Sequence, residues 1–338
     1  MSNVLTFLGD VFLPRAIDCK VDFPGEYIFN LESPITTHDV PAPNKINLRA
    51  TSDHIAETFP RKPLAVCLAN NHILDYGERG FLDTTARLQS HGIKYFGAGT
   101  IAENCNNPLV VEVGGSRVGL MGYVCPSTDP VFARDNIPGV MPLEVRTIAK
   151  DIAEARARGA ERIIVSLHWG EEHVHLPKPA DVRIAHEIID LGADLIIGHH
   201  SHCIQSFEKY KGKAIFYGLG NCVFPTFELD AEFDTQGRSQ RRVRAHWYWW
   251  NRESLMASID LGSENLSLSK LSFENDTTLK EKGRVSMKYR AELGMEEGTF
   301  SRYNRARKYS VLRSAFAQFC SEPRIPRMST VKDLMRWS

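Results

Sequence analysis

The stretch Asp194-Leu195-Ile196-Ile197-Gly198-His199-His200-Ser201-His202 is the key to the whole chain. Its apolar part, Leu195 to Ile197, predicts a short buried strand. Three of the twelve histidines follow within four residues, where that strand is expected to end. Ligands bind at the carboxyl ends of strands in open α/β sheets, and neutral imidazole is a common metal ligand. The stretch therefore favours a metal site at a sheet edge, with a histidine-rich surface loop as the alternative.

The same pattern recurs along the chain, because other short apolar runs also end in polar side chains of the kinds that bind metals. The strands expected at 4–8, 27–31, 64–69, 163–167 and 214–217 are followed by Asp10, Glu32, Asn70-Asn71-His72, His168 and Asn221. Helices expected at 81–88, 143–158 and 180–191 alternate with the strands, which is typical of an α/β sandwich. A globular core gives no reason for a ligand-type residue at the end of every central strand, so we favour a metal site over coincidence.

Composition predicts a folded main domain and a basic extension. The chain has 338 residues and a formal net charge of zero, so nothing in its total charge indicates a nucleic-acid or membrane partner. Residues 276–338 nevertheless hold 14 Lys and Arg against 7 Asp and Glu. We therefore divide the chain into a domain over 1–275 and a basic C-terminal extension over 276–338, with a helix expected at 302–319. The polar residues 228–244 are expected to form a loop or insertion.

The cysteines and the apolar pattern predict a cytoplasmic protein. Seven cysteines are scattered along the chain, and no Cys-x-x-Cys occurs. An odd count without a framework favours reduced thiols. The sequence begins with a strand-like run instead of a signal peptide, and it contains no apolar run of about 18 residues. No membrane span is expected, and the oligomeric state is left open.

The types of side chain indicate which metals fit. Carboxylates, amide oxygens and imidazoles together favour Mn²⁺, Fe or Zn²⁺ over Ca²⁺ or Mg²⁺. Two such cations bridged by a carboxylate would activate water and stabilise charge at a phosphorus or carbonyl centre. Within Asn70-Asn71-His72, an asparagine can bind a metal through its carbonyl oxygen while the histidine moves a proton.

A family resemblance rests on seven motifs in a fixed order. They are Gly9-Asp10, Asn30-Leu31-Glu32-Ser33-Pro34-Ile35-Thr36, Leu68-Ala69-Asn70-Asn71-His72 with Asp75-Tyr76-Gly77, Gly97-Ala98-Gly99, His168-Trp169-Gly170-x-Glu172, Gly198-His199-His200-x-His202 and Gly218-x-Gly220-Asn221. This series resembles the bacterial CapA family of capsule and poly-γ-glutamate synthesis proteins, which is related to the calcineurin-like metallophosphoesterases. The resemblance covers residues 4 to about 225. It implies a four-layer α/β/β/α sandwich of the metallophosphoesterase type with a small C-terminal extension.

The resemblance also implies roles for individual residues. The metal ligands would be Asp10 on one metal, Glu32 as the bridge, Asn71 and His168 on the second metal, and His200 and His202 with one metal each. His72 would donate a proton to a leaving group or stabilise charge. An anionic small-molecule or polymer substrate is implied, and the residues expected around it are Arg49, Asn70, Glu171, His199 and Asn221. Glu171 or Glu172 could orient a ligand.

Two departures from the metallophosphoesterase pattern concern the metal count. Those enzymes usually carry Asp-x-His at the first strand, whereas this chain has Asp10-Val11-Phe12. The bridging position holds Glu32 instead of an aspartate. One or two metal ions are therefore expected. His199 could replace His200 as a ligand, although His200 with His202 keeps the His-x-His spacing.

Three functions are compatible with these residues. The first is a metal-dependent hydrolase that uses a metal-activated water on a phosphoester and is linked to capsule or poly-γ-glutamate-like polymer biosynthesis. The second is a ligase or hydrolase of γ-glutamyl amides in polymer synthesis or release. The third is a non-catalytic component of an envelope polymer assembly complex. The basic extension and the aromatic stretch 246–250 would support the third, although strand packing is the favoured interpretation of that stretch.

Overall fold

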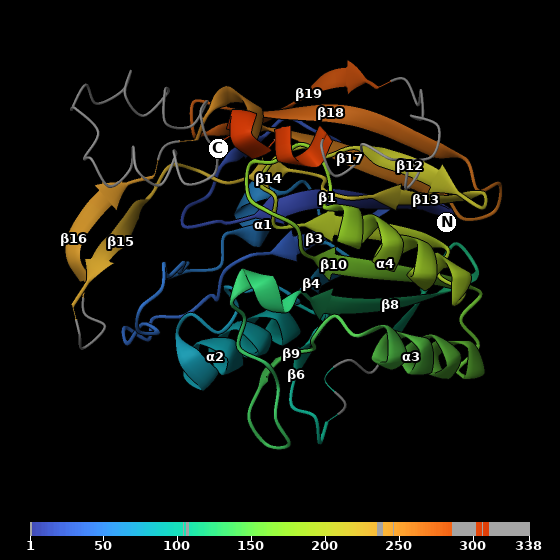
Figure 1. The fold of residues 1–338 in the computed structure, drawn as a ribbon, viewed down its shortest axis with the longest axis horizontal. Coiled ribbons are helices and arrows are strands. Elements are labelled where there is room, and N and C mark those ends of the chain that lie inside the picture. The colour runs from blue at the N-terminus through green and yellow to red at the C-terminus, as the bar shows by residue number, and fades with distance from the viewer. Residues whose placement is uncertain are drawn as a thin grey trace.

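The structure is a computed structural model that describes residues 2–103, 105, 108–234, 239–245, 247–285, 302–305 and 307–310. Two sheets pack face to face, and helices cover their outer faces (Figure 1). This is the four-layer α/β/β/α sandwich that was expected. One large apolar core lies between the sheets, and a second lies between one sheet and its helices.

The first sheet is built around the central strand β1 (Val4–Val11), which is buried in all but its first residue. Its strand order is β2-β19-β18-β17-β1-β3-β4-β5, and β14 pairs with the end of β1. The other strands of this sheet are β2 (Asp18–Cys19), β3 (Glu26–Leu31), β4 (Ala65–Cys67), β5 (Lys94–Phe96), β14 (Asn221–Val223), β17 (Glu253–Asp260), β18 (Leu266–Glu274) and β19 (Thr278–Arg284). The strands β1, β3, β4 and β5 run parallel, so their carboxyl ends meet at one edge.

The second sheet has the order β12-β13-β11-β10-β8-β7. Its strands are β7 (Leu109–Val113), β8 (Ser116–Val124), β10 (Arg162–His168), β11 (Leu195–His199), β12 (Phe207–Tyr210) and β13 (Lys213–Phe216). The strands β8, β10, β11 and β13 are parallel. Their continuous apolar sequences are typical of strands that are covered on both faces.

Helices cover the sheets because each has one apolar face. The helices are α1 (Ile55–Thr58), α2 (Gly77–Ser90), α3 (Val145–Ala157) and α4 (Pro179–Asp190). Helix α3 buries Ile148, Ile152 and Ala155, a spacing of three and four residues that keeps them on one face. Helices α3 and α4 pack on the second sheet, and α2 lies beside β5 of the first sheet (Figure 1). The short elements are β6 (Ala98–Gly99), β9 (Gly139–Val140) and the 3-10 turns η1 (Pro126–Thr128) and η2 (Trp249–Arg252).

Residues 217–221 connect the second sheet to the first at the edge that carries the histidines, and glycines permit close backbone contacts with this segment. A Cβ atom on Gly198 would lie 1.9 Å from the carbonyl oxygen of Tyr217, and one on Gly9 would lie 1.8 Å from that of Gly220. Both neighbours are backbone atoms, so they cannot rotate away. The backbone N–H of Asp10 donates to the same Gly220 oxygen at 2.9 Å. These contacts bring the ends of β1, β11 and β14 together.

The loop or insertion expected at 228–244 is a hairpin in its described part, where β15 (Glu228–Phe233) runs antiparallel to β16 (Ser239–Arg244). Its register pairs position 228 with Arg244 and position 230 with Arg242. The first sheet also continues past residue 275, since β19 pairs with β18. The division at 275 stays a prediction.

Parts of the C-terminal expectations fall outside the described residues. Residues 302–305 and 307–310 are helical, while residue 306 and residues 311–319 of the expected helix lie outside the described part of the chain. His246 of the aromatic stretch also lies outside it. Within the described part, no helix is long and apolar enough to cross a membrane.

Candidate metal centre

The polar residues predicted at the strand ends gather at one place, where the carboxyl edges of the two sheets meet. Asp10 lies on β1, Glu32 directly follows β3, and His168 ends β10. His200 and His202 lie in the loop after β11. All five side chains are at least nine-tenths buried. Two carboxylates and three imidazoles are therefore removed from water together, which costs free energy unless something compensates them.

Two groups of possible ligand atoms share one carboxylate. Asp10, Glu32 and His202 form the first group, and Glu32, His168 and His200 form the second group. The ligand atoms within each group lie within 4.8 Å of one another. A carboxylate common to two groups can bridge two cations. This is the arrangement that the resemblance implies for Glu32.

Neighbouring side chains orient these candidate ligands. His199 donates from Nδ1 to Asp10 Oδ1 at 2.8 Å, and Asn30 donates to the same oxygen at 2.9 Å. His202 donates from Nδ1 to Asn221 Oδ1 at 2.8 Å. This bond fixes the tautomer of His202 and leaves Nε2 free to act as a ligand atom. Sequence reasoning missed Asn30, although it lies in the motif that contains Glu32.

The second group includes a close contact that a shared metal would explain. His168 Nε2 lies 2.9 Å from Asn71 Oδ1, and both residues are predicted ligands of the second metal. Three buried atoms at the centre have no hydrogen-bond partner among the described residues: Glu32 Oε1, His168 Nδ1 and His200 Nδ1. Such orphaned atoms are rare in folded proteins. A divalent cation would satisfy Glu32 Oε1 and would explain why His168 Nε2 lies so close to an amide oxygen, so the residues present fit a metal centre.

Burial and neighbouring charges shift the pKa values of the candidate ligands in different directions. Burial lowers the pKa of His200 to about 4, and burial together with the other histidines lowers the pKa of His168. Burial followed by the negative charge of Asp10 raises the pKa of Glu32 well above its ordinary value. Burial alone would raise the pKa of Asp10, but the neighbouring His199 and His202 outweigh it and lower that pKa. Burial thus favours the neutral, metal-binding form of His168 and His200 and the protonated form of Glu32.

Metal uptake is expected to release a proton from Glu32, because its raised pKa favours the protonated form and a ligand must be deprotonated to bind. Because the pKa of Glu32 is raised, the affinity for Mn²⁺ should increase with pH while Glu32 is protonated. The affinity should level off above that pKa. His168 and His200 release none near pH 6.5, since their lowered pKa values keep them neutral. Calorimetric titration in buffers of different ionisation enthalpy measures how many protons are released on metal binding. An affinity for Mn²⁺ that does not rise with pH would contradict this account.

His72 belongs to a buried chain of polar contacts beside the metal ligands. Its Nδ1 donates to Asp75 Oδ2 at 2.7 Å, and Asp75 Oδ1 pairs with Lys45 Nζ at 2.8 Å. Lys45 also donates to the carbonyl oxygen of Asn71. The contact with Asp75 fixes the ring of His72 and leaves its Nε2 to carry the exchangeable proton. Sequence reasoning missed Lys45 and the role of Asp75, although the i, i+3 spacing of His72 and Asp75 was a usable signal.

Phe12, the departure at the first strand, belongs to an aromatic cluster and offers no ligand. Its ring centroid lies 5.4 Å from those of Phe224 and Phe227. Phe224 and Trp247 also lie against the His202 ring, with centroids 5.1 and 5.4 Å away. The first group therefore has an apolar wall on one side. Trp247 of the aromatic stretch thus lines the centre. The strand expected for that stretch is wrong for residues 247–250, because the 3-10 turn η2 begins at Trp249, which is 63% exposed.

The two consecutive glutamates after His168 have different surroundings. Glu171 accepts hydrogen bonds from Tyr303 and Arg307 of the C-terminal helical residues, both at 2.6 Å. Glu172 is half exposed, and its nearest charged partner is His173 at 3.8 Å. Burial acts to raise the pKa of Glu172, but the surrounding histidines of the centre lower it overall. Glu171 is thus held by two hydrogen bonds, whereas Glu172 stays half exposed near the histidines that lower its pKa.

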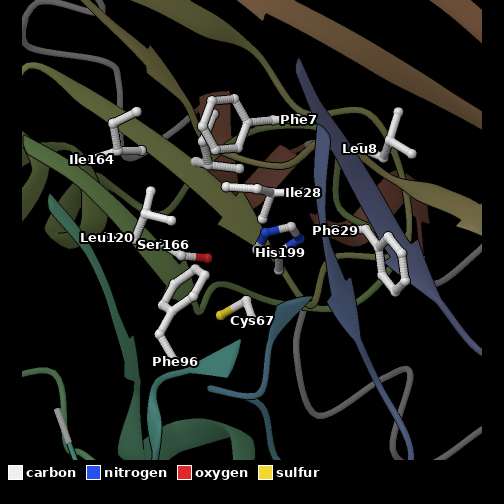
Figure 2. A pocket seen from close by; sticks show the side chains of 11 residues that line it. Phe7, Leu8, Ile28, Phe29, Cys67, Phe96, Leu120, Ile164, Ser166 and His199 are labelled. Atoms are coloured by element: carbon white, nitrogen blue, oxygen red, sulfur yellow. The ribbon is translucent and has the colours of Figure 1, made fainter. Parts of the chain in front are cut away.

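The remaining residues predicted around the substrate are mostly buried. Asn70, His199 and Asn221 are 1–3% exposed. Asn70 donates to Asn30 Oδ1, and Figure 2 shows His199 beside a cavity of about 10 Å³ between the sheets. These three side chains contact protein atoms, which favours a positioning role over contact with substrate. Arg49 donates to the carbonyl oxygen of His38 and lies over the Tyr76 ring, and its role in anion binding stays a prediction.

Sequence comparison agrees with the motifs at this centre. Residues 26–226, more than half of the chain, match the family described as bacterial capsule synthesis protein PGA_cap. The chain belongs to this family. The match contains every candidate ligand except Asp10, which precedes it. Membership in PGA_cap therefore rests on the same segment that builds the centre.

Individual relatives of PGA_cap type support the assignment. The capsule biosynthesis protein CapA of Bacillus anthracis is 31% identical over 243 residues, which are 65% of this chain and 59% of that protein. The PGA biosynthesis protein CapA of Bacillus subtilis strain 168 is 29% identical over 238 residues, 65% of this chain and 62% of that protein. The chain thus matches about three fifths of the length of these relatives.

Solved structures show only a distant likeness. A 5'-nucleotidase precursor from Thermus thermophilus is 16% identical with a TM-score of 0.41, over 81% of this chain and 55% of that one. A hypothetical protein from the same organism is 13% identical with a TM-score of 0.42, over 83% of this chain and all of that one. The description of the fold rests on this chain's own sheets and helices.

Proposed function

We propose that the protein is a metal-dependent hydrolase that acts on a phosphoester, in the biosynthesis of a capsule or a poly-γ-glutamate-like polymer. The observation that carries the proposal is the pair of ligand groups that share Glu32. Divalent metals bound there would lower the pKa of a water molecule and neutralise the charge of a phosphoryl group. Mn²⁺, Fe and Zn²⁺ all suit this set of carboxylate, amide and imidazole ligands.

The chain's own residues supply the remaining functions. His72, held by Asp75, donates a proton from Nε2 to the leaving oxygen. The aromatic wall of Phe224 and Trp247 keeps water away from one side of the centre. His199 and Asn221 hold Asp10 and His202 in place, so that little reorganisation is needed on binding.

A second candidate is a hydrolase or ligase of γ-glutamyl amides. It is favoured by the family assignment and by the relatives whose names refer to capsule and PGA biosynthesis. The same metals and proton donor would serve attack at a carbonyl carbon. Substrate is therefore the point on which the two proposals differ.

A substrate panel tests the proposal. Protein reconstituted with Mn²⁺, Fe²⁺ or Zn²⁺ is offered aryl phosphate monoesters, aryl phosphodiesters and γ-linked glutamate oligomers. The proposal expects turnover of a phosphoester, abolished in His202→Ala and retained in the matched surface variant His91→Ala, since His91 is half exposed at the C-terminal end of α2. Cleavage or extension of the glutamate oligomers alone would replace it with the second candidate. A metal-loaded protein that turns over none of these would contradict both, and a non-catalytic role in polymer assembly would then be favoured.

A further inference from the structure

The helical residues near the C-terminus contact the loop that follows the metal ligand His168. The hydroxyl of Tyr303 donates to Glu171 Oε2 and the guanidinium of Arg307 donates to Glu171 Oε1, each at 2.6 Å. Both oxygens of the carboxylate are therefore engaged. Tyr303 is 7% exposed, although it lies far from His168 in sequence. A buried tyrosine on so distant a segment indicates a specific contact between that segment and the loop.

A third bond reaches the same loop two residues further on. Ser310 Oγ donates to the carbonyl oxygen of His173 at 2.6 Å. His173 has a φ of +64°, in the left-handed region that most side chains avoid. Such a conformation persists only where surrounding contacts determine it. The bond from Ser310 is one of these contacts, and it fixes the peptide that follows His173.

His173 in turn contacts the loop that carries two candidate ligands. Its backbone N–H donates to the carbonyl oxygen of Ser201 at 2.7 Å, between His200 and His202. The Asn251 amide donates to the carbonyl oxygen of His202 at 2.7 Å and lies 2.9 Å from His173 Nδ1. His200 and His202 also have positive φ values, 83° and 51°. The ligand loop thus depends on outside contacts for a conformation that is costly for non-glycine residues.

We propose that the C-terminal helical residues 302–305 and 307–310 form a latch that positions the metal centre. The positioning residues are Tyr303, Arg307 and Ser310, which hold Glu171 and His173, and through His173 the loop of His200 and His202. None of the three is a metal ligand. The proposal rests on the metal centre of the proposed function, and it adds the element that determines how tightly the centre binds metal.

The latch also explains the different surroundings of the two glutamates. Glu172 lies between the two residues that the latch holds, Glu171 and His173, and its side chain is half exposed with His173 Nε2 3.8 Å away. Release of the latch would free Glu172 and His173 together. Loss of this one contact would therefore change both the access to the centre and its affinity for metal.

Two pairs of variants with matched controls test the latch. Arg307→Ala is compared with Arg305→Ala, and Tyr303→Phe with Tyr309→Phe, because Arg305 and Tyr309 are exposed on the same helical segment. Two properties are measured on the full chain. One is backbone hydrogen exchange of residues 170–175 in chelator-treated protein, and the other is the dissociation constant for Mn²⁺ by calorimetry. Circular dichroism checks that each variant is folded. If Arg307→Ala does not fold, Tyr303→Phe still tests the latch, because it removes only one hydroxyl.

The latch predicts about a tenfold faster exchange of the His173 amide in Arg307→Ala, because local opening loses a charged hydrogen bond. The dissociation constant for Mn²⁺ rises about tenfold as well, as is typical when a group that orients ligands is lost. Arg307→Lys restores part of the wild-type exchange protection and part of the Mn²⁺ affinity. In the exposed control variants, both quantities stay within about twofold of wild type.

The outcomes separate the latch from the metal centre itself. If wild type binds Mn²⁺ and Arg307→Ala and Tyr303→Phe bind it equally well, the latch is wrong and the proposed function stands. Unchanged exchange in residues 170–175 of both variants also overturns the latch. If wild type takes up none of Mn²⁺, Fe²⁺ and Zn²⁺, the proposed function fails and the latch fails with it.

Discussion

Glu32→Gln is expected to remove the metals from both groups at once. Glu32 is the residue that the two ligand groups share, and its Oε1 has no other partner among the described residues. Glutamine keeps the size of the side chain but replaces one carboxylate oxygen with an amide nitrogen that cannot bind a cation. We expect metal affinity to fall by at least about 100-fold, since the loss of orienting groups alone costs about 10–100-fold. Elemental analysis after dialysis measures the remaining metal.

Two further variants are compared with Glu32→Gln. His200→Ala removes a ligand of one group and His202→Ala removes a ligand of the other. Each should retain more metal than Glu32→Gln. The exposed Glu78→Gln on α2 should retain the wild-type content. If Glu32→Gln kept its metal while His200→Ala or His202→Ala lost it, Glu32 would not be the bridge.

His72→Ala is expected to reduce kcat by a factor of about 10²–10⁴, the usual contribution of a positioned proton donor. Metal content should not change, because His72 belongs to neither ligand group. Asp75→Asn should reduce kcat less, since it disturbs the tautomer of His72 without removing the ring. Steady-state kinetics on the best substrate of the panel, together with elemental analysis, separates the two effects.

The surface variant His91→Ala controls for general effects of losing an imidazole, since His91 is half exposed and pairs with Asp53. A His72→Ala protein with kcat within a few-fold of wild type would remove the proton-transfer role. A variant that lost both activity and metal would instead assign His72 to the support of the ligands.

The position of the centre was predictable because it follows from topology. Asp10, Glu32 and His168 each lie at the end of an apolar run, and parallel strands bring such ends to one edge. The strand periodicity is a local property of the sequence, so it could be recognised without knowing the contacts. The helices were located for the same reason, since α3 and α4 carry apolar residues at a spacing of three and four.

The contacts around the ligands were not predictable, since they depend on segments far apart in sequence. Lys45 comes from an irregular loop and pairs with Asp75, which lies well beyond it along the chain. Glu171 and Glu172 are adjacent and chemically alike, yet only the packing of Tyr303 and Arg307 gives them different partners. No pattern along the chain indicates which of two neighbouring carboxylates faces a site.

The hairpin of β15 and β16 was missed although its sequence contains a period of two. Acidic residues at 228, 230, 232 and 234 alternate with other residues, which is typical of a strand. Its high charge favoured a loop instead. The register pairs positions 228 and 230 with Arg244 and Arg242 across the hairpin.

The most direct test of the central claim is anomalous X-ray diffraction from crystals of the full chain soaked with Mn²⁺. The account predicts manganese peaks within bonding distance of Glu32, one beside His168 and His200 and one beside Asp10 and His202, with the second weaker if Phe12 leaves that position short of a ligand. Crystals saturated with Mn²⁺ that show no peak at Glu32 would contradict the account.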